Sequence, residues 1–222
     1  MRNRTASPHL VTTLAWSYLF TLIFSLIKQV ESSIQLKLVT LPENLPGKCL
    51  DGTRPVFYVQ KPKLKDEKIS RKEKFLIFLE GGGWCHEPTV ELNTEQFSCD
   101  KRKSEPWIGG TADSKTLLYV KNGILASLTF KDYRKVYVRY CDQSSFSGVR
   151  QMSLKNGTWV GYGLVNFASV VNWLKNRFGM RKGWVKDLVL AGSSAGGLAV
   201  IYRCNDLQKK LHESDHIMHP FC

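Results

Sequence analysis

The chain has 222 residues, of which 32 are lysine or arginine and 19 are aspartate or glutamate, so its formal net charge is +13. With 43% hydrophobic residues, its composition excludes collagen, a coiled coil and an intrinsically disordered protein. The positive charge favours an acidic partner, which could be a nucleic acid, an anionic lipid surface or an acidic polysaccharide.

The first 32 residues have the pattern of a secretory signal peptide. Arg2 and Arg4 precede an uncharged stretch, Leu10–Ile27, and the small residues Ser32 and Ser33 follow where a signal peptidase would cleave. The stretch also reaches the shortest length that spans a membrane, so an uncleaved anchor is the alternative. In both cases residues 33–222 enter the secretory route, and we expect an extracellular or cell-wall location.

Cysteine usage fits that compartment. Six cysteines lie after the signal segment, without a C-x-x-C pair: Cys49, Cys85, Cys99, Cys141, Cys204 and Cys222. An even number in a secreted chain predicts disulfide bonds, with fifteen pairings open to six residues. The sequon that begins at Asn156 (Asn-Gly-Thr) predicts a glycosylated, exposed loop.

Four short apolar runs, bounded by glycine, proline or charge, predict buried strands at 56–59, 75–79, 136–140 and 188–191. The lysine-rich segment 61–74, between the first two, is interpreted as a solvated loop. Because no aromatic residues interleave with its charges and the chain has no nucleic-acid-binding motif, nucleic acid is disfavoured as a partner.

An amphipathic helix is predicted over 165–177, between the last two strands. Gly179 follows as a stop signal, and the apolar residues of the helix repeat at helical spacing: Phe167, Val170, Val171 and Leu174. A strand, a helix and a second strand in this order form a βαβ unit. The predicted fold class is therefore α/β, with a mostly parallel sheet flanked by helices.

The last predicted strand leads into Gly192-Ser193-Ser194-Ala195-Gly196, a G-x-S-x-G motif. A helix is predicted over 198–211, with Leu198, Ile201 and Tyr202 spaced for burial. Between a strand and a helix, this motif holds its serine hydroxyl out at the carboxyl edge of the sheet. Ser194 is thus the predicted nucleophile, and the amide of Ala195, at the helix start, is a predicted oxyanion donor.

A second glycine cluster, Glu80-Gly81-Gly82-Gly83-Trp84-Cys85, follows an earlier predicted strand. Serine hydrolases of this sheet type place further oxyanion donors in such a loop, so the backbone N–H groups of Gly82 and Gly83 are predicted donors. A phosphate-binding loop is disfavoured, because no Lys-Ser/Thr pair follows.

Four blocks of the chain, in order, resemble the pectin acetylesterases and their animal relatives, the Notum-type carboxylesterases. They are Leu50 to Gly52, Phe78 to Cys85, Arg139 to Asp142 with Ser145 to Gly148, and Gly192 to Ala199. The resemblance covers about residues 49–211 and implies an α/β-hydrolase fold, secretion, no cofactor and hydrolysis of carboxylic esters. By motif position it makes Ser194 the nucleophile and Gly82, Gly83 and Ala195 the oxyanion donors.

The same blocks bear on the substrate. The block around Tyr140 and Asp142 resembles the pectin acetylesterase version, whereas Ser193 is closer to the Notum type. We expect Trp84, Tyr140 and Asp142 to contact the substrate.

A serine hydrolase of this fold also needs an acid and a histidine after its nucleophile. Only residues 195–222 follow Ser194, and in the family both groups come much further on, so we assign neither. The chain is interpreted as the N-terminal part of an α/β-hydrolase domain. A helix through residue 211 would carry His212 and His216 more than ~20 Å from Ser194. A zinc site of His212, His216, His219 and Cys222 is disfavoured, because secreted cysteines usually form disulfides. No metal is predicted.

The leading hypothesis is a secreted serine esterase that removes acetyl groups from an acidic, pectin-like polysaccharide through an acyl-enzyme on Ser194. One alternative is a Notum-like deacylase of a protein or lipid ester. Another is a non-catalytic chain without the triad acid and histidine, whose half-sheet would expose a hydrophobic edge. A membrane is expected as a partner only if the N-terminal segment stays uncleaved.

Overall fold

The structure, a computed structural model, describes residues 33–61, 73–86, 97–154, 157–180 and 185–212. The predicted signal peptide, most of the predicted basic loop, and Asn156 lie outside these ranges. The strands that it describes are β1 (Ile34–Thr40), β2 (Val56–Val59), β3 (Glu73–Leu79), β4 (Leu117–Val120), β5 (Arg134–Val138), β6 (Arg150–Leu154), β7 (Gly157–Gly161) and β8 (Val185–Gly192). The helices are α2 (Cys99–Lys103), α3 (Gly123–Ala126), the 3-10 turn η2 (Leu128–Phe130), α4 (Gly163–Phe178) and α5 (Ala195–His212).

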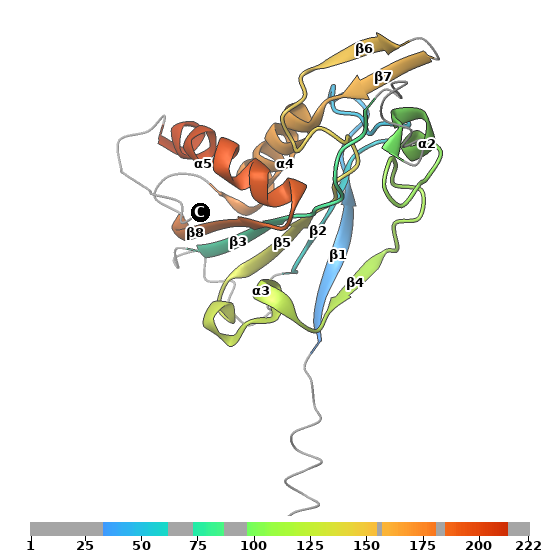
Figure 1. Cartoon of the computed structure of the whole chain (residues 1–222). Coiled ribbons are helices and arrows are strands. Elements are labelled where there is room, and N and C mark those ends of the chain that lie inside the picture. The colour runs from blue at the N-terminus through green and yellow to red at the C-terminus, as the bar shows by residue number, and fades with distance from the viewer. Residues whose placement is uncertain (1–32, 62–72, 87–96, 155–156, 181–184, 213–222) are drawn as a thin grey trace, which may run out of the picture. The chain divides into compact units, whose positions relative to one another are not determined.

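Six of the strands form one sheet in the order β4-β1-β2-β5-β3-β8 (Figure 1). Strands β5, β3 and β8 run parallel, as the predicted βαβ unit requires, with α4 in the crossover. The pairs β1/β2, β1/β4 and β2/β5 are antiparallel, so the sheet is mixed and the prediction of a mostly parallel sheet is corrected for this half. For β1 and β2 the physical reason is that no helix separates them in the sequence, and a connection without a crossover returns the chain antiparallel.

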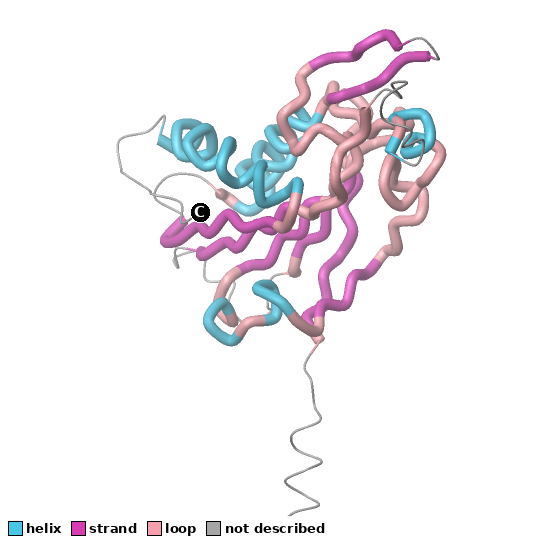
Figure 2. The backbone as a smooth tube through the Cα atoms, in the orientation of Figure 1, coloured by secondary structure: helices cyan, strands magenta, loops and turns pink. Residues whose placement is uncertain are grey.

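Helices α4 and α5 lie on the same face of the sheet, and the large core is between them and the strands (Figures 1 and 2). Alternate residues of β3, namely Phe75, Ile77 and Leu79, point into this core and are fully buried. The other face is partly covered by the segment of α3 and η2, whose Phe130 carbonyl accepts a hydrogen bond from the Lys135 ammonium of β5. An α/β sheet flanked by helices is thus confirmed.

The predicted helix at 165–177 is confirmed as α4, and Gly179 ends it in a left-handed conformation with φ of 62°. The predicted helix at 198–211 is α5, but its buried face differs from the prediction. Ile201 and Tyr202 are 70% and 55% exposed, whereas Ala199 and Leu207 are fully buried. No helix among the described residues is both long and apolar enough to cross a membrane.

Two disulfides are described, as the cysteine count predicted. Cys49–Cys141 joins the loop before β2 to the segment after β5. Cys85–Cys99 joins the end of the glycine-rich segment to the start of α2. Both therefore hold loops at the end of the sheet where β3, β5 and β8 terminate.

Candidate active site

Ser194 occupies a sharp turn between β8 and α5. Its φ is 51°, in the left-handed region that non-glycine residues rarely adopt, and its side chain is exposed. The flanking glycines are required by close packing. A Cβ at Gly192 would lie 2.4 Å from the carbonyl oxygen of Gly196, and one at Gly196 would lie 2.2 Å from that of Leu79. The turn expected of a G-x-S-x-G motif is thus present, at a backbone cost of about 1–3 kcal/mol.

The glycine-rich segment lies directly beside this turn, although the two are far apart in sequence. A Cβ at Gly81 would lie 2.5 Å from the carbonyl oxygen of Ser193 and 2.9 Å from the Cβ of Ser194. The Ser193 amide also donates a 3.2 Å hydrogen bond to the carbonyl of Leu79. The reason is the sheet: β3 and β8 are parallel neighbours, so their carboxyl ends, which carry the two motifs, meet at one edge.

Two hydrogen bonds fix the peptide planes of the glycine-rich segment. Nη1 of Arg102 donates to the carbonyl oxygen of Gly82 at 2.5 Å, and the hydroxyl of Tyr140 donates to that of Gly83 at 2.9 Å. Because a trans peptide unit is planar, holding its carbonyl oxygen on one side directs its N–H to the other. Arg102 and Tyr140 therefore set the directions of the Gly83 and Trp84 amides.

Arg102 is the functional candidate that sequence reasoning missed. It lies in α2, is 7% exposed, and also donates to Oε1 of Gln143 at 2.7 Å. No acidic side chain in the described ranges forms an ion pair with it, and its Nε is buried without a hydrogen bond. It sits among other cations in the short run CDKRK, and nothing in that run marks it out from Lys101 or Lys103 as a buried residue.

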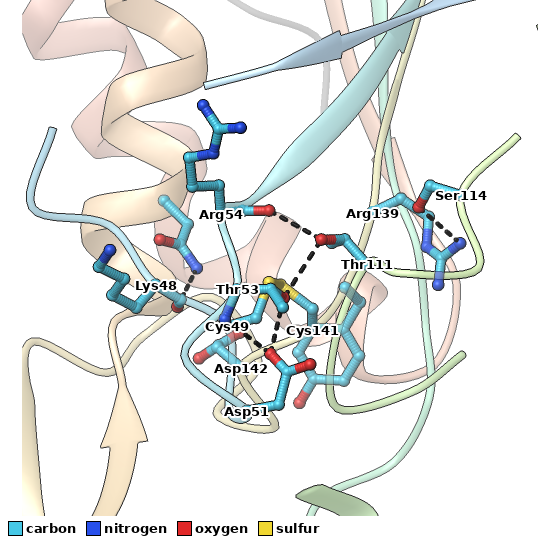
Figure 3. The surroundings of a disulfide bond; sticks show 12 residues. Lys48, Cys49, Asp51, Thr53, Arg54, Thr111, Ser114, Arg139, Cys141 and Asp142 are labelled. Atoms are coloured by element: carbon cyan, nitrogen blue, oxygen red, sulfur yellow. Dashed lines mark hydrogen bonds between the residues drawn. A yellow bond between two sulfur atoms is a disulfide. The ribbon is translucent and has the colours of Figure 1, made fainter. Parts of the chain in front are cut away.

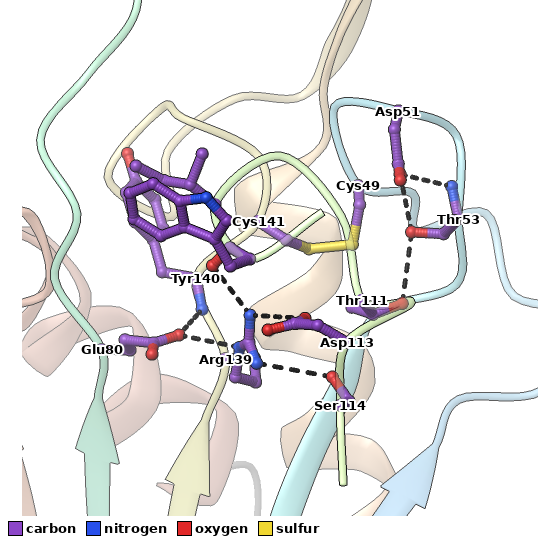
Figure 4. Close-up of polar contacts among 12 residues, drawn as sticks. Cys49, Asp51, Thr53, Glu80, Thr111, Asp113, Ser114, Arg139, Tyr140 and Cys141 are labelled. Carbon is purple, nitrogen blue, oxygen red and sulfur yellow. Dashed lines mark hydrogen bonds and ion pairs between the residues drawn. A yellow bond between two sulfur atoms is a disulfide. The ribbon is translucent and has the colours of Figure 1, made fainter. Parts of the chain in front are cut away.

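Glu80 joins the ends of β3 and β5 in a polar network (Figure 4). Its carboxylate accepts hydrogen bonds from the Tyr137 hydroxyl at 2.6 Å and the Tyr140 amide at 2.8 Å, and pairs with Nε of Arg139 at 3.2 Å. Burial raises the pKa of Glu80, while Arg139 and the hydrogen bonds oppose the rise. Arg139 also pairs with Asp113 at 3.4 Å. This network holds the segment that leads into Gly81.

The three residues expected to contact substrate lie in different surroundings. Tyr140 and Asp142 are each 1% exposed, and the Tyr140 hydroxyl is used by Gly83 and by the Ser145 amide. Their burial is the physical reason why neither offers a surface to substrate as the structure stands. Trp84 is 48% exposed and its indole N–H donates to Oγ of Ser145, so it remains a candidate for substrate contact.

Asp142 is held under the start of α4. Its carboxylate accepts hydrogen bonds from the hydroxyl and amide of Ser144 and from the amide of Gly163. Burial nevertheless raises the pKa of Asp142 to about 6. An aspartate whose pKa is higher in the folded than in the unfolded protein stabilises the fold below its unfolded pKa and loses that contribution as pH rises through the folded value.

We therefore expect the ionisation of Asp142 to lower the free energy of unfolding by about 2 kcal/mol between pH 4 and pH 7. The variant Asp142→Asn lacks this ionisation. Its stability relative to the wild type, measured by urea denaturation, should improve over that pH range, while Asp132→Asn, a control at an exposed carboxylate, should show no such trend. A difference between Asp142→Asn and wild type that stays constant with pH would contradict the expectation.

Histidines in the described ranges are His86 and His212. His86 exchanges backbone hydrogen bonds with Phe97 and Cys99, beyond the glycine-rich segment. His212 ends α5, and at 1.5 Å per residue it lies about 25 Å from Ala195, as the sequence predicted. The described residues contain no group of His, Cys, Asp and Glu suited to a metal ion. The rest of the disfavoured zinc set, at 216, 219 and 222, lies outside them.

Comparison with known proteins adds an independent line of evidence. The family model for pectinacetylesterase matches residues 27–219. Pectin acetylesterase 5 of Arabidopsis thaliana is 30% identical over 178 residues, which cover 78% of this chain and 38% of that protein. Palmitoleoyl-protein carboxylesterase NOTUM of Schmidtea mediterranea is 29% identical over 180 residues, or 79% and 31%. The Mus musculus NOTUM is 28% identical over 193 residues, or 84% and 34%.

The chain thus spans about a third of the length of these curated relatives. The match itself runs through the turn of Ser194 and the glycine-rich segment, and the relatives of both kinds carry the names of carboxylesterases. Since the family model covers most of the sequence, the chain belongs to the pectinacetylesterase family.

Proposed function

We propose that this protein is a serine carboxylesterase that hydrolyses acetyl esters of a pectin-like acidic polysaccharide, with Ser194 as its nucleophile. The observation that carries the proposal is the exposed Ser194 on a left-handed turn, packed against a glycine-rich segment whose peptide planes are held by Arg102 and Tyr140. The family membership and the relative named pectin acetylesterase support this substrate class. The net charge of +13 would attract an acidic polymer.

In this mechanism Oγ of Ser194 attacks the acetyl carbonyl carbon, and the carbonyl electron pair moves to the oxygen. The resulting oxyanion would be received by the amides of Gly82, Gly83 and Ala195, which donate to no other described residue. Ala195 begins the 18-residue helix α5, so its amide carries the positive end of the helix dipole. Collapse of the intermediate expels the sugar oxygen, which takes up the proton that the Ser194 hydroxyl loses on attack, and water then hydrolyses the acetyl-serine, which releases acetate and returns a proton to Oγ.

Tyr140, Asp142 and Glu80 act as positioning residues in this proposal. Tyr140 and Asp142 are buried and Glu80 is partly buried, and each holds backbone near the site: Tyr140 the Gly83 carbonyl, Asp142 the start of α4, and Glu80 the Tyr140 amide. Trp84 is the proposed surface for a sugar ring, because its indole is half exposed and follows Gly83 directly. The disulfides fit a secreted protein, which is the proposed location.

The choice between acetyl and long-chain esters is open to a direct assay. We expect acetate release from acetylated pectin, and hydrolysis of p-nitrophenyl acetate at least about tenfold faster than that of p-nitrophenyl palmitate, because a site shaped for acetyl has no room for a long chain. A preference for the palmitate ester would instead favour a deacylase of lipid-modified proteins, the activity that the name of the Schmidtea relative states.

A further inference from the structure

A polar cleft of about 660 Å³ lies at the same end of the sheet as Ser194, over β1 and β2. Its floor is formed by Leu38, Thr40 and Val56. Val56 is the first residue of β2 and lies beside the carboxyl end of β5, since its carbonyl accepts a hydrogen bond from the Arg139 amide. Because Phe57 points into the core under α4, its neighbour Val56 points to the opposite face of the sheet. The cleft that Val56 lines therefore lies on that opposite face.

The wall of this cleft is held by hydrogen bonds and a disulfide within the protein (Figure 3). The hydroxyl and amide of Thr53 donate to Oδ1 of Asp51 at 2.6 and 2.8 Å. The Thr111 hydroxyl lies 2.9 Å from the carbonyl oxygen of Arg54 and 3.2 Å from the Thr53 hydroxyl. The adjacent Cys49–Cys141 disulfide ties this turn to the segment after β5. A wall held in this way loses little conformational freedom on binding, which favours affinity.

Two cations line the cleft without a strong acidic partner. Lys48 forms no ion pair with a described residue, and its backbone is anchored by a 2.9 Å hydrogen bond from Asn166 of α4 to its carbonyl. Among the residues that the structure describes, Arg54 pairs only with Glu43, at 3.9 Å, and both side chains are well exposed, so the pair contributes little. In Figure 3 both cationic side chains extend away from the disulfide. Hydroxyls of Thr53, Thr111 and Ser114 complete the polar lining.

We infer that this cleft binds a carboxylated oligosaccharide, with Lys48 and Arg54 on a uronate carboxylate and the three hydroxyls on sugar hydroxyls. The cleft would give the acidic polymer a second point of attachment besides the Ser194 turn. The relation between these two sites rests on the proposed function. Three strand spacings separate β2 from β8, or about 14 Å, so the cleft is distinct from the Ser194 turn. The polar contacts of Ser114 with Arg139 and of Arg139 with Glu80 link the cleft to the glycine-rich segment.

Isothermal titration calorimetry with a trimer of galacturonic acid tests the inference, with a neutral galactose trimer as the ligand control. We expect Lys48→Gln and Arg54→Gln each to weaken binding by about tenfold, as expected when a charged hydrogen-bond partner is lost. Glu43→Gln should tighten it by about threefold, because the competing carboxylate is removed. Lys186→Gln, at an exposed lysine of β8 remote from the cleft, should leave it unchanged. Raising the salt from 50 to 500 mM should weaken binding.

Equal binding of the neutral trimer would overturn the role of the carboxylate, and uronate binding that all three cleft variants leave intact would place the ligand elsewhere. The measurement is repeated on Ser194→Ala, which separates the two proposals. Ser194→Ala should bind as the wild type does, whereas cleft-dependent binding by a wild-type protein that shows no esterase activity would support the cleft and count against the proposed reaction. Esterase activity on acetylated pectin without cleft-dependent binding would do the reverse.

Discussion

Replacing Ser194 by alanine is expected to lower the rate of acetyl ester hydrolysis by at least about 10⁴-fold, because the reaction loses its nucleophile. The neighbouring Ser193→Ala is the matched control. It also removes an exposed hydroxyl from the same turn but should retain the rate within about threefold, since Ser193 approaches Gly81 and bonds to Leu79 through its backbone, which the substitution keeps. Acetate release from acetylated pectin measures both variants.

A fluorophosphonate probe followed by peptide mass spectrometry provides a second readout. We expect the label on Ser194 in the wild type and in Ser193→Ala, and none in Ser194→Ala. A third variant, Ser194→Gly, should remove activity and yet increase stability. Glycine at 194 adopts a φ of 51° without strain, so the free energy of unfolding should rise by about 1 kcal/mol. Equal activity of Ser194→Ala and wild type would show that another residue is the nucleophile.

The second large effect is expected at Arg102. Arg102→Met fills a similar volume but frees the Gly82 carbonyl, so the Gly83 amide is no longer directed. Loss of one oxyanion donor lowers kcat by about 10²- to 10³-fold in other serine hydrolases, and we expect a fall of that order with KM changed little. A residue that acts only through the transition state should show this division between kcat and KM.

Stability distinguishes this role from a structural one. In Arg102→Met the lost hydrogen bonds lower the stability, whereas the removal of a buried cation that lacks an acidic partner raises it. These two effects offset each other, so the free energy of unfolding should change by less than about 2 kcal/mol. Lys101→Met, one residue earlier and exposed, is the control and should keep full activity. Arg102→Lys should recover part of kcat, because lysine can still donate to Gly82. A proportional loss of stability and activity in Arg102→Met would contradict the positioning role.

Local sequence patterns were sufficient to predict the central strands of the sheet and helix α4. The apolar runs marked β2, β3, β5 and β8, and the apolar repeat with its glycine stop marked α4. Strands β1 and β4 are absent from the predicted set. β4 is only four residues long and none of its residues is fully buried, so its sequence lacks the signal of a core strand. The hairpin of β6 and β7 pairs outside the main sheet and was likewise not predicted.

The phase of α5 shows where sequence patterns fail. Periodicity alone favoured burial of Leu198, Ile201 and Tyr202, but the exposed residues include the last two. Gly196 lies against the Leu79 carbonyl, so this side of the helix faces the sheet, and Ala199, Val200 and Leu207, three, four and eleven residues later, are buried. A contact between segments more than a hundred residues apart thus overrode the local apolar pattern.

What the sequence by itself determined is two local motifs and the family: a G-x-S-x-G turn after a strand, a glycine-rich segment after an earlier strand, and membership of the pectinacetylesterase family. These are local properties, because a tight turn needs glycine wherever it is placed. Only the tertiary structure decided that the two segments meet at one sheet edge, that Arg102 is buried against Gly82, and that Tyr140 and Asp142 face inward. Burial and hydrogen-bond partners depend on which strands become neighbours, and the pairing of β3 with β8 is a long-range choice that no short stretch of sequence encodes.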